Sequence, residues 1–133
     1  MGKRNTGRRI AMQALYEIDF GASTDIEEII DRISKEEAVS DDSFNFAKEL
    51  ATGAFYKKKE IDSIIEKHSR DWQIGRIGGV DRNILRVALF ELAFTKTPPQ
   101  VVINEALELA KKYSSPEAAK FINGVLGGYV KAN

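Results

Sequence analysis

The segment from Val80 to Phe94 constrains the fold more than any other part of the sequence, because it is apolar on nearly every helical face. Its apolar positions are Ile84, Leu85, Val87, Ala88, Leu89, Phe90 and Leu92. A helix that is apolar all round belongs at the centre of a bundle, where other helices cover it. Thr97-Pro98-Pro99 follows, so we predict that this helix stops there and that another opens at the prolines.

The rest of the chain also has helical spacing, and no stretch of strict alternation indicates a strand. Three segments predict helix starts: a capping box over residues 24–27 that begins at Thr24, Ser40 or Asp41, and Ser115 before Pro116. Gly53 or the lysine run 57–59 is expected to bend the long segment after Ser40. We therefore predict an all-α fold of about seven helices, with residues 1–133 as one domain of two packed sub-bundles.

The net charge of zero conceals a segregation of charge along the chain. Residues 1–16 carry four bases and no acid, residues 17–49 carry eleven acids against three bases, and residues 57–133 carry thirteen bases and nine acids. Such segregation favours an anionic partner for one region and a basic partner for another. Chance clustering on a solvated surface explains it equally well, and charge alone does not decide.

The residue types present argue against an enzyme. The 133 residues contain no cysteine, and His68 is the only histidine, so neither a thiolate cluster nor a metal-ligand spacing is found. The glycines at 75, 78 and 79 lack the preceding strand of a dinucleotide loop. No apolar run approaches the ~20 residues of a membrane span, and no apolar segment follows the basic N-terminus. We expect a cytoplasmic binding module without metal or cofactor.

The first predicted helix points to single-stranded RNA. Its apolar stripe is Ile10, Ala11, Ala14, Leu15 and Ile18. At 100° per residue, Arg9, Gln13 and Tyr16 lie together on the opposite side, after a basic and flexible arm over residues 1–8. Cations bind phosphates, and an exposed ring offers a stacking platform for a base. The alternative is that Tyr16 packs on a neighbouring helix and that the arm is merely disordered.

The last predicted helix gives a similar signal. Phe121 lies at the border of its apolar stripe, close to Glu117 and Gly124, and Lys120 precedes it. Small residues one turn apart let another backbone approach closely, whether it belongs to a helix or to a nucleic acid. Burial is the commoner explanation for a single aromatic residue, and the neighbouring lysine favours a ligand.

Four ordered segments resemble the NusB family of bacterial antitermination factors. Residues 9–16 (RIAMQALY) resemble the first helix of that family, and residues 80–92 (VDRNILRVALFEL) resemble its central helix. Residues 102–111 (VINEALELAK) and 120–126 (KFINGVL) resemble its last two signatures. Trp72 and Pro99 also stand where the family pattern expects them. The resemblance covers nearly the whole chain in the right order.

The resemblance implies a fold of two three-helix sub-bundles with an extra helix. It implies binding of the boxA element of nascent RNA together with NusE, a small-subunit ribosomal protein, and an indirect link to the RNA polymerase elongation complex. Asp81 is expected on the surface for the protein partner. The RNA contacts expected from the resemblance and from the two faces are Lys3, Arg4, Arg8, Arg9, Gln13, Tyr16, Glu117, Lys120 and Phe121.

The resemblance also suggests structural roles for several polar residues. Asn104, Glu105 and Asn123 are expected to be buried and to tie helices together, and Arg86 is expected to pair with Glu91. The sequence departs from the family pattern at residues 127–128, where two glycines follow the last signature in place of an acid. Each interior glycine costs a helix roughly 1 kcal/mol against alanine, so the last helix is expected to fray there.

Two other functions stay open at this stage. A helical adaptor that binds only protein predicts no salt-dependent RNA binding. The same domain also resembles the N-terminal RNA-binding module of ribosomal RNA cytosine methyltransferases, but the sequence ends at Asn133 without a cofactor-binding α/β domain. We therefore expect a free-standing factor. A homodimer that masks the basic face is a further possibility.

Overall fold

The predicted all-α class is confirmed by the structure, a computed structural model that describes residues 2–21, 23–70 and 72–133. Those residues form seven α-helices and one 3₁₀ turn, η1, and contain no strand. The helices are α1 (Lys3–Asp19), α2 (Ile26–Glu37), α3 (Asp41–Tyr56), α4 (Lys58–His68), α5 (Gly79–Phe94), α6 (Pro99–Tyr113) and α7 (Pro116–Ala132), with η1 (Ile74–Arg76) between α4 and α5.

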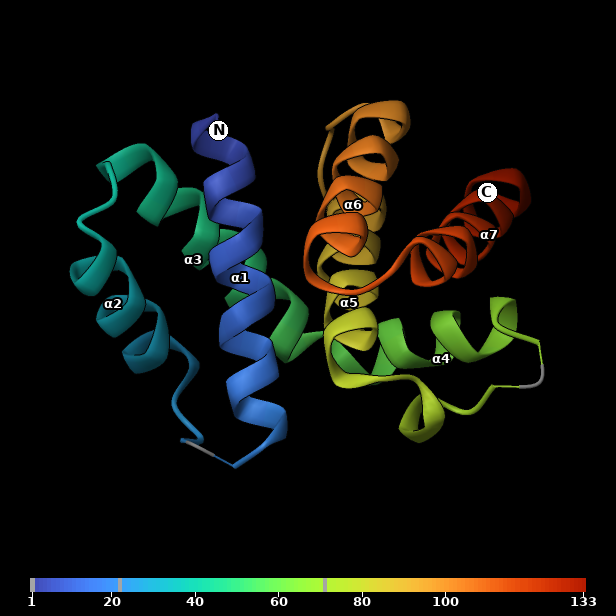
Figure 1. The fold of residues 1–133 in the computed structure, drawn as a ribbon, viewed down its shortest axis with the longest axis horizontal. Coiled ribbons are helices and arrows are strands. Elements are labelled where there is room, and N and C mark those ends of the chain that lie inside the picture. The colour runs from blue at the N-terminus through green and yellow to red at the C-terminus, as the bar shows by residue number, and fades with distance from the viewer. Residues whose placement is uncertain (1, 22, 71) are drawn as a thin grey trace.

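The helices form the two expected sub-bundles. Helices α1, α2 and α3 pack on one another, and α4, α6 and α7 pack around α5 as the second group with its extra helix. Helix α5 also contacts α1 and α3, so it joins the two groups. In Figure 1, α1 to α3 lie on the left, α4 and α7 on the right, and α5 and α6 between them.

Helix α5 is central because its side chains are buried on every side, as its composition predicts. Ile84, Leu85, Val87 and Leu89 are all within 3% of full burial, and they belong to one continuous hydrophobic core. The predicted stripe of α1 faces the same core, where Ile10, Ala11, Ala14 and Leu15 are buried. Burial of this kind stabilises the fold by about 1.5–3 kcal/mol for each large apolar side chain.

Two of the predicted helix starts are confirmed. The Ser40 hydroxyl accepts a hydrogen bond from the amide of Ser43 at 3.2 Å and caps α3. The Ser115 hydroxyl does the same for α7, accepting from the amide of Ala118 at 3.0 Å. In each case the hydroxyl satisfies an amide that has no partner within the helix.

Three local expectations, on the cap of α2, the bend after α3 and the fraying of α7, have a different or a narrower outcome. Thr24 does not cap α2, because the carboxylate of Asp25 accepts from the amide of Glu28 at 3.1 Å instead. The bend in the long segment falls at Lys57, where α3 ends and α4 begins, and not at Gly53. Helix α7 continues through both late glycines to Ala132.

The flexible arm expected over residues 1–8 is wrong for the residues described there, because α1 begins at Lys3. Two contacts hold this first turn against α3. The Ser43 hydroxyl donates to the carbonyl of Lys3 at 3.0 Å. The absent side chain of Gly7 lets the two helices approach, since a Cβ there would lie 3.2 Å from the backbone of Ala47. The basic residues near the N-terminus are therefore mounted on a helix.

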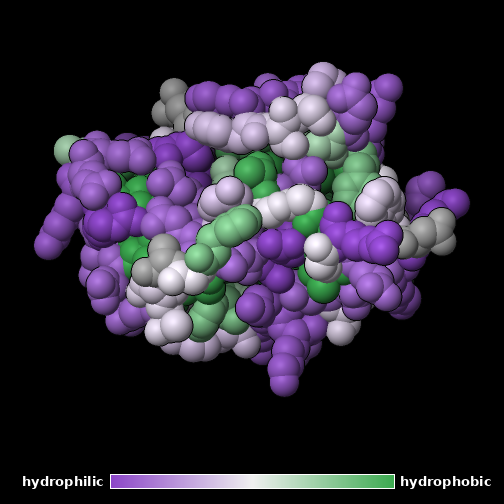
Figure 2. All heavy atoms as spheres, turned by 60° about the horizontal axis from the view of Figure 1, so that its bottom comes forward, coloured by the Kyte–Doolittle hydropathy of each residue, from purple (hydrophilic) through white to green (hydrophobic). Residues whose placement is uncertain are grey.

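The face of the molecule drawn in Figure 2 is mainly hydrophilic. Figure 2 shows the face at the lower end of Figure 1, where hydrophobic groups reach the surface in separate small areas surrounded by hydrophilic ones. Among the described residues, no helix is both long enough and apolar enough to cross a lipid bilayer.

Candidate nucleic-acid interface

The predicted polar face of α1 exists, but its charge is partly neutralised. Arg9, Gln13 and Tyr16 are all half-buried. The guanidinium of Arg9 pairs with the carboxylate of Glu37 at the end of α2, and it also donates to the Gln13 side chain at 3.4 Å. The amide of Gln13 in turn donates to Glu17 at 3.4 Å. A phosphate bound at this face would have to compete with Glu37 for Arg9.

The ring of Tyr16 packs against the start of α5 at Gly79. Its ring lies 4.6 Å from the ring of Phe20, centroid to centroid. A Cβ at Gly79 would lie 3.0 Å from Phe20 and 3.1 Å from Tyr16, so any side chain there would press on both rings. Phe20 is 65% exposed. The sequence reasoning missed Phe20, although its position one turn after Tyr16 on the same helix was a usable signal.

The cations at the start of α1 are of two kinds, the exposed Lys3 and Arg4 and the buried Arg8. Lys3 and Arg4 are exposed, Lys3 makes a 3.3 Å ion pair with Asp42, and the Arg4 guanidinium lies 4.3 Å from the ring centroid of Phe46. These exposed groups can exchange their partners for a phosphate, since surface ion pairs contribute only about 0–1 kcal/mol.

Arg8 does not suit the direct RNA contact expected of it, because it is buried. Its Nε and Nη2 donate to the two carboxylate oxygens of Glu91 at 2.7 and 2.6 Å, and its Nη1 donates to the Asn5 side chain at 2.6 Å. The side chain of Arg8 is 5% exposed and that of Glu91 is fully buried. Arg8 thus ties α1 to the end of α5, and the expected pairing of Glu91 with Arg86 is wrong.

A second buried ionic cluster lies at the other end of α1. The Arg86 guanidinium donates to Asp19 at 2.9 and 3.0 Å and to Asp62 at 2.8 and 2.9 Å. Arg82 and Asn83 also donate to Asp19, at 3.0 and 2.9 Å. Burial acts to raise the pKa of Asp19, but the hydrogen bond from Asn83 and the charge of Arg86 outweigh it and lower that pKa. This cluster joins α1, α4 and α5 beneath the surface.

The resemblance predicts that Asn104, Glu105 and Asn123 are buried, and the structure contradicts this prediction. Asn104 and Asn123 are exposed and Glu105 is half-buried, because their positions on α6 and α7 face outwards. Asn83 is the asparagine with no exposed surface among the described residues, and its amide donates both to Asp19 and to the carbonyl of Gly79 at 2.8 Å.

The predicted residues of α7 border a depression on the second sub-bundle. Glu117 and Lys120 are exposed, and Phe121 is half-buried beside the apolar stripe. The depression lies between α7 and the segment after α4, and it is lined by His68, Ser69, Arg70, Trp72, Lys120, Phe121, Gly124 and Val125. Trp72 is 50% exposed. The sequence reasoning did not assign Arg70 or Trp72 to the site, and their distance along the chain from residue 120 gave no signal.

Asp81 lies in the first turn of α5, two residues after Gly79. Its Oδ1 is shielded from solvent, and no donor within the described residues bonds to it. A shielded carboxylate oxygen without a donor costs about 1–3 kcal/mol or more. The ring of Tyr16 contacts the same turn at Gly79, but Gly79 and Asp81 are two positions apart and point to different sides of α5.

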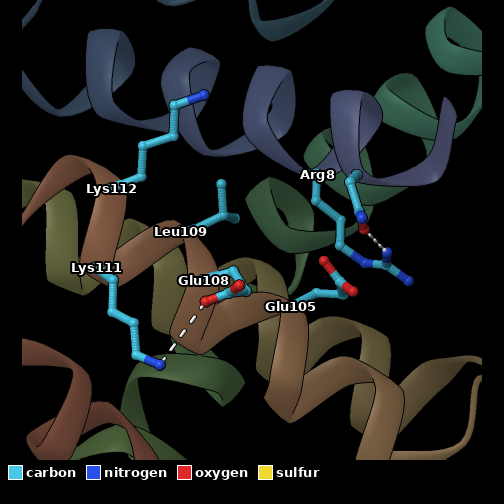
Figure 3. Close-up of a pocket in the computed structure, with 7 residues that line it drawn as sticks. Arg8, Glu105, Glu108, Leu109, Lys111 and Lys112 are labelled. Carbon is cyan, nitrogen blue, oxygen red and sulfur yellow. Dashed lines mark hydrogen bonds and ion pairs between the residues drawn. The ribbon is translucent and has the colours of Figure 1, made fainter. Parts of the chain in front are cut away.

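A cleft between α1 and α6 separates the two halves of the surface. Its lining residues are Asn5, Arg8, Glu105, Glu108, Leu109, Lys111 and Lys112. Figure 3 shows Arg8 on α1 facing Glu105 on α6, with Lys111 turned towards Glu108 at 3.8 Å. Cations and carboxylates alternate here, so the cleft has no strong preference for an anion. Within the described part of the chain, no group of three or more side chains can hold a metal ion.

The structure thus brings some predicted site residues together and keeps others apart. Arg9, Gln13 and Tyr16 share one face of α1, and Asp81 adjoins it at the start of α5. Helix α7 packs on α4, α5 and α6, so its residues 117–121 form a separate area on the other sub-bundle. Figure 1 shows α5 and α6 between the two areas. A nucleic-acid strand that contacts both areas would have to cross the middle of the molecule.

Comparison with known proteins identifies a family whose sequences match this chain. A sequence model of the NusB family matches residues 5–131. The transcription antitermination protein NusB of Desulfitobacterium hafniense is 43% identical over 131 residues, covering 97% of this chain and 88% of that protein. The protein of the same name from Myxococcus xanthus is 40% identical, covering 95% of this chain and 93% of the relative.

Solved structures agree in fold. The NusB chain of a crystal structure of antitermination factors NusB and NusE in complex with dsRNA superposes with a TM-score of 0.90 at 36% identity, covering 100% of this chain and 99% of that one. T. maritima NusB superposes with a TM-score of 0.88 at 32% identity, covering 98% and 92%.

Proposed function

The chain belongs to the NusB family, and from that premise we propose that it binds boxA-type single-stranded RNA together with NusE to promote processive transcription of ribosomal RNA. It acts by assembly and catalyses no reaction. The link to RNA polymerase is indirect, through the bound RNA and partner. The observation that carries the proposal is the contact of Tyr16 with Gly79, because it sets the predicted RNA face of α1 against the first turn of α5, the turn that also carries Asp81.

The surfaces proposed for RNA and for the protein partner adjoin, so each ligand can raise the affinity of the other. RNA bound over Tyr16 and a protein partner bound at Asp81 would meet at the start of α5. If each ligand raises the affinity of the other, thermodynamic linkage requires the same factor in both directions. The solved NusB–NusE complex contains dsRNA, whereas stacking on Tyr16 and Phe121 requires unpaired bases, so single-stranded RNA is the ligand proposed here.

In this proposal the RNA contacts are the exposed or half-buried members of the predicted set. The exposed cations bind phosphates, the two rings accept bases, and Arg8 supports the surface from beneath. The direct contacts are Lys3, Arg4, Arg9, Gln13, Tyr16, Glu117, Lys120 and Phe121. Glu117 carries a negative charge and therefore suits base edges with amino groups and not phosphates.

Fluorescence anisotropy of a labelled boxA RNA, titrated with and without NusE, tests the proposal. A scrambled RNA, a duplex competitor and two salt concentrations serve as controls. We expect tighter, sequence-dependent binding with the partner, and an affinity that falls as salt rises. Tyr16→Ala and Phe121→Ala are each expected to weaken binding by roughly 1–3 kcal/mol with helicity unchanged.

If neither the boxA RNA nor the scrambled RNA binds under any condition, the protein-only adaptor is the better account. Equal binding of the boxA and scrambled RNAs would leave an RNA-binding protein without the proposed specificity. Light scattering of the same samples tests the homodimer, which predicts a halving of particle mass when RNA displaces the second copy.

A further inference from the structure

One face of α3 borders a depression that the proposed RNA contacts share only at Arg4. Phe46, Glu49, Gly53 and Tyr56 recur three or four positions apart, so they line one side of the helix. The start of α1 borders the floor at Phe46 and Glu49, where Arg4 lines the same depression. The end of α5 borders it with Thr95 and Lys96. We call this depression, together with the face of α3 that continues from it to Tyr56, the α3 groove.

Beyond the depression, aromatic rings continue along the same face of α3. The ring of Phe90 lies directly on Gly53, in the space that any side chain there would need. Phe94 stacks on Phe90 with 5.4 Å between centroids and is 43% exposed. Tyr56, one turn after Gly53, is 74% exposed. Two large rings are therefore exposed at this end of α3, and one of them, Phe94, has the ring of Phe90 stacked against it.

Cations alternate with these rings. The Lys57 ammonium lies 5.1 Å from the centroid of Phe94, as the Arg4 guanidinium lies 4.3 Å from that of Phe46. Within the described residues, Arg4, Lys57 and Lys96 make no ion pair. Lys58 and Lys59 follow at the start of α4.

The groove also holds acidic side chains. Glu49 lies on the floor, Glu105 lies at the α6 edge, and Glu60 follows the lysine run. They are outnumbered by the cations, but Glu49 stands between the two cation–ring pairs and repels an anion there.

We propose that the α3 groove binds a second stretch of single-stranded RNA, outside the segment held by α1 and α7. This inference rests on the proposed function, which supplies the RNA. Exposed rings accept bases of any sequence, and ammonium groups beside them bind the phosphates. Arg4 belongs both to the groove and to the predicted contacts of α1, so one strand can pass from one surface to the other without a break.

The alternation of lysine with aromatic rings favours RNA over a protein partner. Interface cores between proteins are depleted of lysine, because desolvating an ammonium is costly. Here Arg4 and Lys57 each lie over a ring on an open surface, which leaves them hydrated until a phosphate arrives. A protein partner is the competing occupant, and the experiment below separates the two.

The test compares two labelled RNAs by anisotropy, with the full chain and NusE present. The short RNA is the boxA element alone, and the long RNA carries about ten additional uridines at its 5′ or 3′ end, a length typical of one stacking platform. We expect one of the long RNAs to bind wild-type protein about five-fold or more tightly than the short RNA.

Variants assign that gain to the groove. Phe94→Ala and Lys57→Ala are each expected to abolish most of the gain without changing the affinity for the short RNA, whereas Glu49→Gln is expected to increase it. Lys48→Ala is the matched control: Lys48 also lies near a ring on α3, 6.0 Å from Phe44, but it faces α2 and pairs with Glu27. Lys57→Ala is expected to lower the salt slope for the long RNA by about one.

The possible outcomes distinguish a failure of the proposed function from a failure of the groove inference. If the short RNA does not bind, the proposed function fails. If it binds and neither extension adds affinity, the groove inference is overturned and the proposed function survives. If Phe94→Ala weakens binding of purified NusE but leaves the gain from the extension intact, the groove binds protein and the inference is wrong. Circular dichroism checks folding, and Lys57→Ala, on the surface, keeps the test valid should Phe94→Ala unfold.

Discussion

Replacing Arg8 by alanine is expected to unfold the protein more readily without removing a direct RNA contact. Arg8 and Glu91 lie 83 positions apart in sequence and form two short hydrogen bonds with almost no exposed surface. The substitution leaves the Glu91 carboxylate buried without its cation. Breaking a buried pair by removing one partner costs about 3–5 kcal/mol, because an uncompensated charge stays behind.

The expected change is large against the total stability of a domain. A loss of about 3–5 kcal/mol is a substantial share of the roughly 5–15 kcal/mol that separates folded from unfolded states. For a chain of this length, each kcal/mol shifts the melting temperature by about 3–5 °C, so Arg8→Ala is expected to melt roughly 10–20 °C lower. Arg4→Ala, one turn earlier and exposed, is the matched control and should change stability by less than about 0.5 kcal/mol.

Urea unfolding followed by circular dichroism measures both variants, and RNA anisotropy below the melting temperature measures binding. We expect Arg8→Ala to bind RNA with an unchanged salt slope and Arg4→Ala to lower that slope by about one. The double variant Arg8→Met/Glu91→Leu should recover most of the stability, since apolar pairs often replace buried ion pairs without loss. A cost below about 1 kcal/mol for Arg8→Ala, or a double variant as unstable as the sum of the single ones, would refute the reasoning.

Three further outcomes follow from local geometry. Gly127→Ala is expected to stabilise α7 by about 0.5–1 kcal/mol, because nothing lies within 4 Å of the new Cβ, whereas Gly128→Ala should gain less, since its Cβ meets the ring of His68 at 3.2 Å; thermal melts of the two variants compare them directly. Asp19 has a lowered pKa, so the stability it contributes is present above its ordinary value of 3.8 and is lost as pH falls through the folded value. The difference in unfolding free energy between wild type and Asp19→Asn should therefore shrink below about pH 4, and a difference that stays constant down to pH 2 would contradict this. Ser115→Ala removes the cap of α7 and is expected to cost about 0.5–2 kcal/mol in urea unfolding, with Ser114→Ala as a control of little effect.

Local chemistry made much of this fold predictable from the sequence. Ser40 and Ser115 mark helix starts because a hydroxyl before a helix satisfies an amide nearby, and Pro99 suits a first helical turn. The position of α5 followed from its composition alone, since a helix without a polar face has to be covered. These signals lie within a few residues of the feature that they predict.

The errors concern contacts between residues distant in sequence. The sequence places Arg8 in a basic cluster, and only the fold brings Glu91 to it. Asn83 is buried while Asn104 and Asn123 are exposed, because burial depends on which helix lies opposite and not on the residue type. Trp72 was missed for the same reason, because it forms a surface only with Lys120 and Phe121 of α7. Phe20 is different: it follows Tyr16 by one turn, so local spacing was enough to include it.

The two buried ionic contacts of α5 bear directly on the proposed function. Glu91 holds α1 at Arg8 and Arg86 holds it at Asp19, eleven residues or roughly 16 Å further along the helix. Two anchors so far apart fix the rotation of α1 as well as its position, and Tyr16 lies between them. Buried ion pairs add little net stability compared with apolar contacts. We therefore infer that their value is geometric: a ring presented in one orientation loses less freedom when a base stacks on it, and binding is stronger for that reason.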